Sequence, residues 1–417
     1  MKAVGIIAEY NPFHNGHQYH LKESLAQSGA EASVAVMSGD FVQRGYPACA
    51  DKWKRAEMAV VGGVDLVFEL PFAYAVNSAD FFAKGAVRLL SGLGCVETLS
   101  FGSEEGELPR LEAAASLLAD ESPDFQETLR RASGQGMSYP KARASALSRF
   151  LGEEDFLKEP NNILAIEYLR QLKLLKSKIK PLTVRRKDAD YHSSRLPFAA
   201  GDQEGEGLFA SAQALRRGRE EKEPFDALVT FVPKEARDVL YRIYTGIQPK
   251  MNDYFLPLSV ILLRGDPVET AEIFAAREGI ENRLISKIRV SETTDQLIDE
   301  VLSKRYTRTH VCRLLTQLLV GLRRSDFLRI DEGRAMYAHV LAFSEKGALL
   351  LREIKKKELS SIPVLTKLSK TGICEQLPRE EERMLLSYDL RASDLFALAS
   401  GKRLYDASDF VKKPFLG

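Results

Sequence analysis

The sequence predicts an α/β protein, with a doubly wound parallel sheet in its first half and a mainly α-helical second half. Two observations predict this architecture. Short, continuous apolar runs alternate with stretches of helical spacing over residues 1–105, and helical spacing dominates after about residue 225. Hydrophobic residues make up 45% of the chain and charged residues 28%, which is the composition of a folded globular protein.

Strands and helices are expected to alternate through the first half. An apolar run without polar interruptions is typical of a strand that is buried on both faces of a parallel sheet. Short connections between such runs and amphipathic helices favour a doubly wound sheet. We expect strands at residues 3–8, 32–37, 64–70 and 96–101, and helices at residues 17–28, 51–62 and 78–90.

The rest of the chain is predicted to be more helical. Residues 106–180 show helical spacing and more charge, and residues 181–184 resemble a strand. A polar, glycine-rich stretch at residues 188–207 predicts a mobile loop. We expect a domain boundary near residues 220–230. This gives a first domain of residues 1–225, with a helical insertion at about 106–180, and a mainly helical second domain of residues 226–417.

Composition excludes several classes of protein. The 417 residues include 59 basic and 58 acidic side chains, so the net charge of +1 excludes a polybasic tail protein. The four cysteines are far apart, which disfavours a disulfide framework or a thiolate zinc site and favours a reducing cytoplasm. No apolar run reaches the ~18–20 residues of a membrane span, so no membrane contact is expected.

Three of the six histidines fall close together, at His14, His17 and His20. They follow the first predicted strand, at the carboxyl edge of the sheet where open α/β folds bind ligands. A helix that begins there offers free N–H groups to a phosphate. His14 and His17 are three residues apart and can donate hydrogen bonds to phosphoryl oxygens. No metal site is predicted, because no cysteine or further histidine lies nearby in sequence.

The segment His14-Asn15-Gly16-His17 resembles the HxGH motif of the nucleotidyltransferase superfamily, which includes the class I aminoacyl-tRNA synthetases. This resemblance implies a Rossmann-like (HUP-type) fold in which both histidines are catalytic and stabilise charge at the α-phosphate of ATP. Residues 211–216 resemble the mobile loop that clamps the β- and γ-phosphates in that superfamily. Ser211 and Arg216 are the expected clamp, and the alternative is a solvated helix start.

A longer set of motifs resembles the bacterial tRNA(Met) cytidine acetate ligase family. The motifs occur in order over roughly residues 5–310, at positions 5–17, 37–47, 69–71, 101–104, 160–164, 186 with 191–192, 281–283 and 304–307. The resemblance implies that ATP and acetate form acetyl-adenylate, whose acetyl group passes to N4 of the wobble cytidine of elongator tRNA(Met). It also implies Mg²⁺ carried by the phosphates of ATP. The chain departs from the pattern at Tyr46, where relatives often have Glu, and at Asp40, where they often have Asn.

The ATP-binding positions of that family carry over residue by residue. Asn161 and Arg185 remain alternatives to their neighbours Asn162 and Arg186. The positions are Ile7, Ala8, Glu9, Tyr10, Asn11, Pro12, Phe13, His14, Asn15, Gly16, His17, Gln18, Tyr19, His20, Gly102, Asn162 and Arg186.

Two stretches of the chain are strongly basic. Residues 169–187 hold eight basic side chains and no acidic one, and residues 301–329 hold seven against Asp326 alone. Such patches attract a phosphate backbone, although a single charge run is usually a solvated helix face. Aromatic side chains beside them, including Tyr191 and His192, could stack on unpaired bases. The expected tRNA contacts are Lys304, Arg305, Tyr306, Arg308 and Arg313.

Two other functions remain open from the sequence. A small-molecule adenylyltransferase would share the fold and the histidines, and a tRNA-binding module without catalysis would share the basic patches. DNA is not an expected partner. No residue is identified as the base for acetyl transfer: Asp40 is a candidate, but loop capping is favoured for it, and Glu9 is similarly ambiguous. The acetate pocket and the oligomeric state are not predicted.

Overall fold

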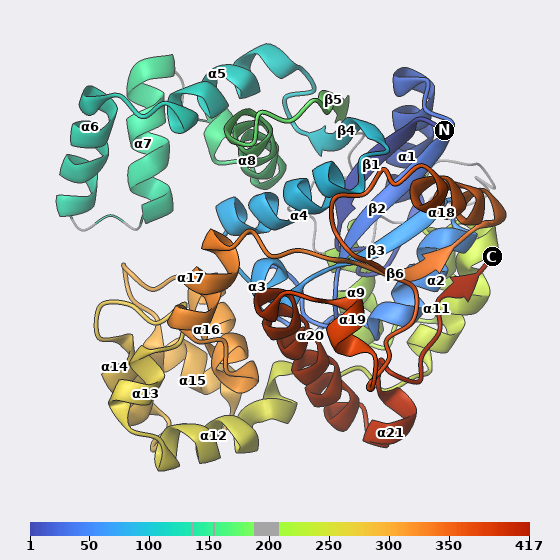
Figure 1. Cartoon of the computed structure of the whole chain (residues 1–417). Helices are drawn as coiled ribbons and strands as arrows, with labels where there is room; N and C mark the ends of the chain where they lie inside the picture. Colours follow the sequence, from blue (N-terminus) through green and yellow to red (C-terminus); the bar gives the residue numbers. More distant parts are fainter. Residues whose placement is uncertain (136, 138, 153–154, 187–207) are drawn as a thin grey trace.

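The computed structural model describes residues 1–417 except 136, 138, 153–154 and 187–207. Its centre is a sheet of eight strands (Figure 1). Their order is β5-β4-β1-β2-β3-β6-β7, with β8 paired to β6. The strands are β1 (Ala3–Ala8), β2 (Ala32–Ser38), β3 (Leu66–Leu70), β4 (Val96–Ser103), β5 (Lys180–Arg185), β6 (Ala338–Phe343), β7 (Val364–Leu365) and β8 (Phe415–Leu416).

The predicted parallel sheet is confirmed for the first half of the chain. Strands β5, β4, β1, β2 and β3 are mutually parallel, and their bounds lie within two residues of the predicted ones. The strands of the second half were not predicted. Strand β6 runs antiparallel to β3, while β7 and β8 are parallel to β6. The second half is mainly helical, but it also completes the sheet, so the boundary near residues 220–230 does not end the sheet.

Helices cover both faces of the sheet, as a doubly wound fold requires. Alternate residues of β2 show this directly. Val34 and Val36 join one core, which includes buried residues of α4 (Ala79–Leu93) and α8 (Pro160–Leu174). Ala35 and Met37 join the other core, which includes buried residues of α1 (Asn15–Ser28) and α2 (Lys52–Val61).

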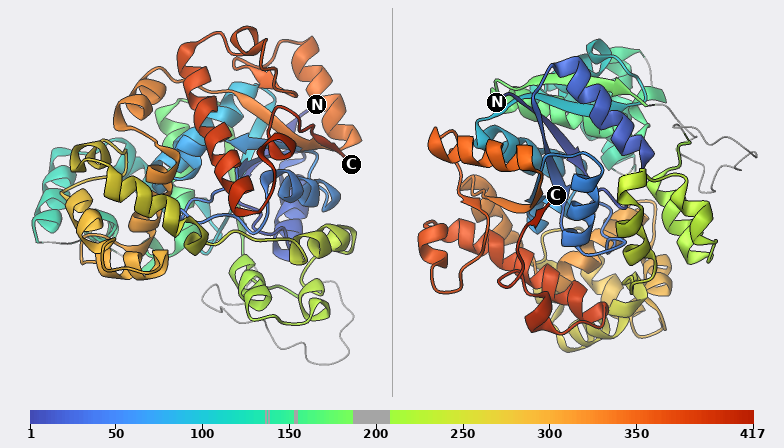
Figure 2. Two further views of the ribbon diagram at one scale, coloured as in Figure 1. Left: turned by 90° about the horizontal axis from the view of Figure 1, so that it is seen from below. Right: turned by 90° about the vertical axis from the view of Figure 1, so that its right-hand side faces the viewer.

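The remaining helices lie around the sheet (Figures 1 and 2). Between β4 and β5 lie α5 (Leu108–Ala119), α6 (Pro123–Gly134), α7 (Tyr139–Leu151), η1 (Asp155–Leu157) and α8, which match the predicted insertion. The others are α3 (Phe72–Ala75), α9 (Ala212–Glu220), α10 (Phe225–Val229), η2 (Lys234–Ala236), α11 (Arg237–Tyr244), η3 (Met251–Tyr254), α12 (Phe255–Arg264), α13 (Pro267–Ala271), α14 (Ile280–Lys287), α15 (Thr294–Val301), α16 (Arg308–Val320), α17 (Arg324–Glu332), α18 (Glu345–Lys356), α19 (Ile373–Gln376), α20 (Glu380–Ala399) and α21 (Leu404–Ala407).

Three further predictions concern the glycine-rich stretch, membrane spans and the cysteines. The glycine-rich stretch at 188–207, with Tyr191 and His192, lies outside the described residues. No helix among the described residues is both long and apolar enough to span a membrane. The four cysteines are unpaired, and only Cys374 is exposed.

Candidate active site

The turn between β1 and α1 is held by a reciprocal hydrogen-bonded cap. His14 caps α1 in an extended conformation, and its Nδ1 accepts a hydrogen bond from the backbone N–H of Gly16 at 3.1 Å. The backbone N–H of His14 donates to Nδ1 of His17 at 3.3 Å. The arrangement is a capping box in which two imidazoles replace the usual hydroxyl and carboxylate. The HxGH segment therefore fixes its own histidines through the start of the helix.

This cap also fixes the tautomer of both rings. A neutral imidazole has one acceptor nitrogen and one N–H donor, and in both rings Nδ1 is the acceptor. The remaining proton of each ring is therefore on Nε2. The ring centroids of His14 and His17 are 3.8 Å apart and the planes are inclined by 33°. The turn thus carries two neighbouring N–H donors at a helix N-terminus, where an anion is stabilised.

Gly16 is required by the ring of His14. A Cβ atom at this position would lie 2.9 Å from Cε1 of His14 and 3.1 Å from its Nδ1. Any side chain there would move the imidazole away from the backbone N–H that it caps. The glycine between the two histidines is therefore a steric condition for the cap, rather than a source of flexibility.

All three histidines of the turn are held neutral. Burial and the charges of Arg186 and Arg216 lower the pKa of His14 to about 3. Burial and Arg186 lower the pKa of His20 to about 4, and burial lowers the pKa of His17 as well, with His14 and Arg186 contributing. Nε2 of His20 is already bonded to the Ser100 hydroxyl at 3.2 Å. His14 and His17 are therefore the pair with N–H groups available to a ligand.

Arg186 brings a permanent positive charge to the same place. It follows β5, and its backbone N–H donates to the carbonyl of Ser103 at 3.2 Å, beside the end of β4. Its side chain packs over Gly102, where a Cβ would lie 3.4 Å from Cγ of Arg186. Arg185 instead packs against Gly106. Of the two candidate arginines, Arg186 is the one whose charge acts on the three histidines.

The predicted clamp helix α9 lies against the turn. Ser211 caps α9, because its hydroxyl accepts from the backbone N–H of Ala214 at 3.0 Å. Arg216 donates to the backbone carbonyl of Asn11 at 2.6 Å. Asn15, at the start of α1, donates to the carbonyls of Leu208 and Thr230. Residues on both sides of α9 are thus attached to the histidine turn, and a contact of Ser211 with phosphate stays a prediction.

Asn162 is placed as a structural residue. It is buried, its Oδ1 accepts from the backbone N–H groups of Glu104 and Glu105, and its Nδ2 donates to the carbonyl of Phe156. Asn161 donates to the Glu104 carboxylate at 2.6 Å. Asn162 therefore shapes the loop after β4, and a direct contact with ATP stays a prediction.

The other carried-over positions lie along the same turn. Tyr10 and Phe13 point into the core, and a Cβ at Gly62 would lie 2.5 Å from Cε1 of Phe13. Gln18 donates to the carbonyl of Gly62 at 3.4 Å. The end of β1, the turn and the first turns of α1 hold the rest, namely Ile7, Ala8, Glu9, Asn11, Pro12, Asn15 and Tyr19.

Asp40 has the capping role that the sequence favoured. Its Oδ1 accepts from the backbone N–H of Lys52 at 2.7 Å, and its Oδ2 accepts from the Ser393 hydroxyl at 2.9 Å. Burial raises its pKa to about 6. The neighbouring buried ammonium of Lys52 contacts Glu69 at 2.7 Å and Asp409 at 2.6 Å. Both oxygens of Asp40 are occupied within this network, which argues against a role as a base.

Sequence reasoning missed Arg55, which holds the carboxyl ends of two strands. This arginine on α2 is fully buried and donates to backbone carbonyls alone. One bond reaches Glu9, after β1, at 2.6 Å, and another reaches Ser38, at the end of β2, at 3.0 Å. The available sign was its helical spacing from Met58 and Ala59, which puts Arg55 on the buried face of α2. A buried guanidinium needs several acceptors. Its charge lies just behind the histidine turn.

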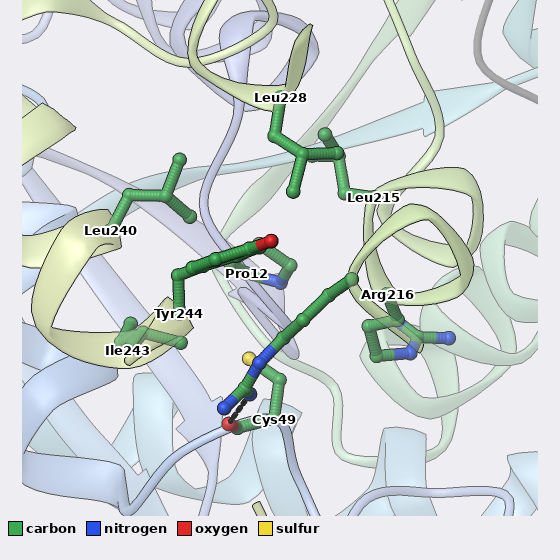
Figure 3. A pocket seen from close by; sticks show the side chains of 9 residues that line it. Pro12, Cys49, Leu215, Arg216, Leu228, Leu240, Ile243 and Tyr244 are labelled. Atoms are coloured by element: carbon green, nitrogen blue, oxygen red, sulfur yellow. Dashed lines mark hydrogen bonds between the residues drawn. The ribbon is translucent and has the colours of Figure 1, made fainter. Parts of the chain in front are cut away.

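A small cavity lies beside Arg216 (Figure 3). Its volume is about 20 Å³, which is room for about one water molecule. The lining residues are Pro12, Cys49, Leu215, Arg216, Arg219, Leu228, Leu240, Ile243 and Tyr244. Most of them belong to the second hydrophobic core. The space is therefore a packing gap under α9, and it does not identify an acetate pocket.

The predicted tRNA contacts differ in exposure and in the protein groups that they already bind. Lys304 and Arg305 are exposed. Arg308 forms ion pairs with Asp295 at 2.9 Å and Asp299 at 2.5 Å. These acids precede the counted stretch, so the local charge near Arg308 is lower than the sequence indicated. The hydroxyl of Tyr306 donates to the Glu278 carbonyl at 2.8 Å, and Arg313 is half-buried.

Among the described residues there is no group of three or more His, Cys, Asp or Glu side chains that could hold a metal ion. The cluster at the carboxyl edge therefore consists of two neutral imidazole donors, a helix N-terminus and arginines. Such a set stabilises negative charge that develops on a phosphoryl group.

Comparison with known proteins agrees with this geometry. Residues 1–408 match the model of the HIGH Nucleotidyl Transferase family. The tRNA(Met) cytidine acetate ligase of Caldanaerobacter subterraneus subsp. tengcongensis is 42% identical over 404 residues, which cover 96% of each chain. The ligase of the same name from Acetivibrio thermocellus is 38% identical, over 95% of each chain.

A solved structure has the same fold over its whole length. Thermotoga maritima TmcAL bound with alpha-thio ATP superposes with a TM-score of 0.88 at 28% identity, covering 100% of this chain and 99% of the other. Its form without a ligand gives a TM-score of 0.91. The chain belongs to the tRNA(Met) cytidine acetate ligase family of HIGH nucleotidyl transferases.

Proposed function

We propose that this protein uses ATP to activate acetate and then acetylates N4 of the wobble cytidine of elongator tRNA(Met). The observation that carries the proposal is the convergence of two neutral imidazole donors and Arg186 at the start of α1. The full-length ligase relatives support the choice of acetate and tRNA(Met) over a phosphorylated metabolite.

In the first step a carboxylate oxygen of acetate attacks the α-phosphorus of ATP. The bond to pyrophosphate breaks and acetyl-adenylate forms. Acetate is ionised at neutral pH, as a carboxylic acid with a pKa near ~4.3 would be, so no base is needed. The Nε2–H groups of His14 and His17 donate to the α-phosphoryl oxygens, where charge grows in the transition state. Arg186 adds its charge there, and Ser211 and Arg216 act on the β- and γ-phosphates.

Magnesium enters with its nucleotide. We assign Mg²⁺ to the phosphates of ATP, where it neutralises charge on the departing pyrophosphate. The residues near the turn suit this arrangement, because most of them are imidazoles and arginines, and the carboxylate of Glu9 already accepts from the backbone N–H of Gln43.

In the second step the N4 amine of cytidine attacks the acetyl carbonyl carbon. The bond to AMP breaks, AMP leaves with the electron pair, and the amine loses a proton. The adenylate is a good leaving group, so positioning of the cytidine supplies much of the rate. Both oxygens of Asp40 are engaged in the fold, and we assign no proton transfer to it.

We assign the ATP site to residues 1–225 and tRNA binding mainly to residues 226–417. The exposed basic side chains Lys304 and Arg305 support the second assignment. A tRNA substrate places the reaction in the cytoplasm.

Release of AMP from ATP tests the proposal. The purified protein is incubated with ATP and Mg²⁺, with and without acetate and with and without bulk tRNA. We expect AMP to form through many turnovers only when acetate and tRNA are both present, because AMP leaves in the second step. AMP formation that ignores acetate, or no AMP under any of these conditions, contradicts the proposal.

A further inference from the structure

Arg313 is a half-buried arginine without a protein partner. It lies on α16, and its guanidinium forms no hydrogen bond or ion pair with any residue that the structure describes. Burial lowers its pKa to about 10, and the charge of Asp80 acts in the opposite direction. A guanidinium carries five N–H donors, and no nitrogen of Arg313 is both buried and unpartnered, so these donors face solvent. They are therefore open to an anion from outside the chain.

A second unsatisfied group lies one turn earlier on the same helix. Nε2 of His310 is buried and has no hydrogen-bond partner among the described residues. Burial and the charges of Arg313 and Arg277 lower the pKa of His310 to about 4. The hydroxyl of Tyr306 donates to the backbone carbonyl of Arg277 at 3.5 Å, which places Arg277 beside the ring that stacks on His310. The ring of His310 stacks on Tyr306, with centroids 6.0 Å apart and planes inclined by 18°. This stack fixes the position of the imidazole.

Arg308 provides a contrast on the same helix. Its guanidinium is neutralised by Asp295 and Asp299, and it also donates to the hydroxyl of Tyr46 at 3.3 Å. Arg277 is exposed and Arg313 is unpaired, whereas Arg308 already has two anions. Arg313 and Arg277 are therefore the basic side chains that an external anion could pair with. The count of basic residues in the sequence does not show this.

The helix that carries Arg313 adjoins the edge of the proposed ATP site. Gly45 packs on the backbone of α16, where a Cβ atom would lie 2.4 Å from the backbone nitrogen of Arg313. The hydroxyl of Thr316 donates to the carbonyl of Gly45 at 2.6 Å. Two residues before Gly45, the backbone N–H of Gln43 donates to the carboxylate of Glu9 at 3.1 Å. A short loop thus connects α16 to the end of β1.

We propose that Arg313, with His310 and Arg277, forms a subsite that binds a backbone phosphate of the tRNA near the cytidine to be acetylated. The position of α16 against residues 43–45, which bond to Glu9 at the end of β1, favours an RNA whose cytidine reaches the histidine turn. The choice of RNA rests on the proposed function. A free phosphate of a nucleotide has the same chemistry and is distinguished by the test.

The test compares single substitutions in the full-length protein. The dissociation constant for a tRNA(Met) transcript is measured over a range of KCl concentrations for Arg313→Gln, Arg277→Gln and Lys356→Gln. Lys356 is exposed on α18 and serves as the matched control for the loss of one charge. The second readout is acetate-dependent exchange of pyrophosphate into ATP without tRNA, which reports the ATP site.

We expect Arg313→Gln to weaken tRNA binding about tenfold and to lower the slope of log K against log salt by about 1. This loss should far exceed its loss of exchange rate. Arg277→Gln, at an exposed position that does not threaten folding, should weaken binding about threefold, and Lys356→Gln should match the unaltered protein. Arg313→Lys should recover part of the affinity.

Three results overturn the proposal. The first is Arg313→Gln and Arg277→Gln binding tRNA as Lys356→Gln does. The second is an equal loss of exchange and tRNA affinity, which assigns Arg313 to a nucleotide phosphate. The third is a loss of exchange rate without loss of tRNA affinity. If the unaltered protein binds no tRNA, the proposed function fails together with the subsite, which separates that outcome from the first.

Discussion

The edge of the sheet and the face of α16 hold their polar groups in different ways. At the edge, His14 and His17 are fixed by each other and by backbone N–H groups within four residues. On α16, the state of Arg308 depends on acids from α15, and Arg313 has no partner among the described residues. The first arrangement is local in sequence and complete without a ligand. The second depends on long-range contacts, and in our proposal an anion from the tRNA completes it.

This difference shows that the charge of a cluster of like residues depends on the partners that the fold brings to it. The histidine turn remains a cluster in space, with Arg186 added from β5. The basic stretch 301–329 does not, because some of its charge is cancelled. We therefore expect substitutions at the histidine turn to lower the rate of ATP activation strongly. Substitutions on and near α16 should lower tRNA affinity by smaller, graded amounts.

The largest effect is expected for His17→Ala. It removes an Nε2–H donor to the α-phosphate, and we expect acetate-dependent exchange of pyrophosphate into ATP to fall by ~10²–10³-fold. The thermal unfolding midpoint should change little. His20→Ala is the matched control, because Nε2 of His20 is bonded to Ser100, and it should lose much less. Equal losses in the two variants would break the distinction between donors and supporting histidines.

Gly16→Ala should lower the exchange rate by about tenfold. The added Cβ would lie 2.9 Å from His14 and displace the ring that caps α1. Gly134→Ala, in α6, is the control, because a Cβ there meets nothing within 4 Å. Exchange kinetics of both variants are compared with the unaltered protein. A Gly16→Ala variant with full activity would show that the cap does not position the histidines.

On the helical face we expect smaller effects on tRNA affinity. The double variant Lys304→Gln/Arg305→Gln should weaken binding several-fold and lower the salt slope by up to ~2, since both side chains are exposed and Arg305 has only a long, exposed ion pair with Glu278, at 3.4 Å. Arg308→Gln should weaken binding less than threefold, because its N–H groups already serve Asp295 and Asp299. Titration of a tRNA transcript at several salt concentrations measures both. A larger loss for Arg308→Gln would reverse the ranking.

We expect no change of activity at the pH where a histidine with an ordinary pKa would gain a proton. His14 and His20 have pKa values lowered to about 3 and about 4, so both stay neutral as the pH falls from 8 to 6. We expect kcat/KM for ATP in the exchange reaction to be constant over this range, because that ratio reports the free enzyme. A sigmoidal change centred near the ordinary histidine value of ~6.5 would show that an imidazole of the turn gains a proton there.

The sequence predicted the local features well because local physics determines them. Short apolar runs became β1 to β4, and the histidines lie where a strand meets a helix. Strand β6 was missed because its six residues lie between two helices, and its pairing with β3 joins residues about 270 positions apart. The contacts of Lys52 with Glu69 and Asp409 are invisible for the same reason.

Two features of the candidate site could not be predicted from the sequence: the choice between Arg185 and Arg186, and the local charge near Arg308. The structure distinguishes Arg186 from Arg185 by the side of β5 that each one occupies, which the motif alone left open. The count of basic residues began at residue 301 and so omitted Asp295 and Asp299, which lie on the preceding helix. Charge in a window of sequence overstates charge in space whenever a neighbouring helix supplies the partners.

The most direct test of the central claim is mass analysis of the nucleosides of tRNA(Met) after incubation with the protein, ATP, Mg²⁺ and isotopically labelled acetate. We expect the unaltered protein to form labelled acetylcytidine at the wobble position. With His17→Ala this product should be almost absent. Consumption of ATP and acetate while the wobble cytidine stays unmodified would contradict it.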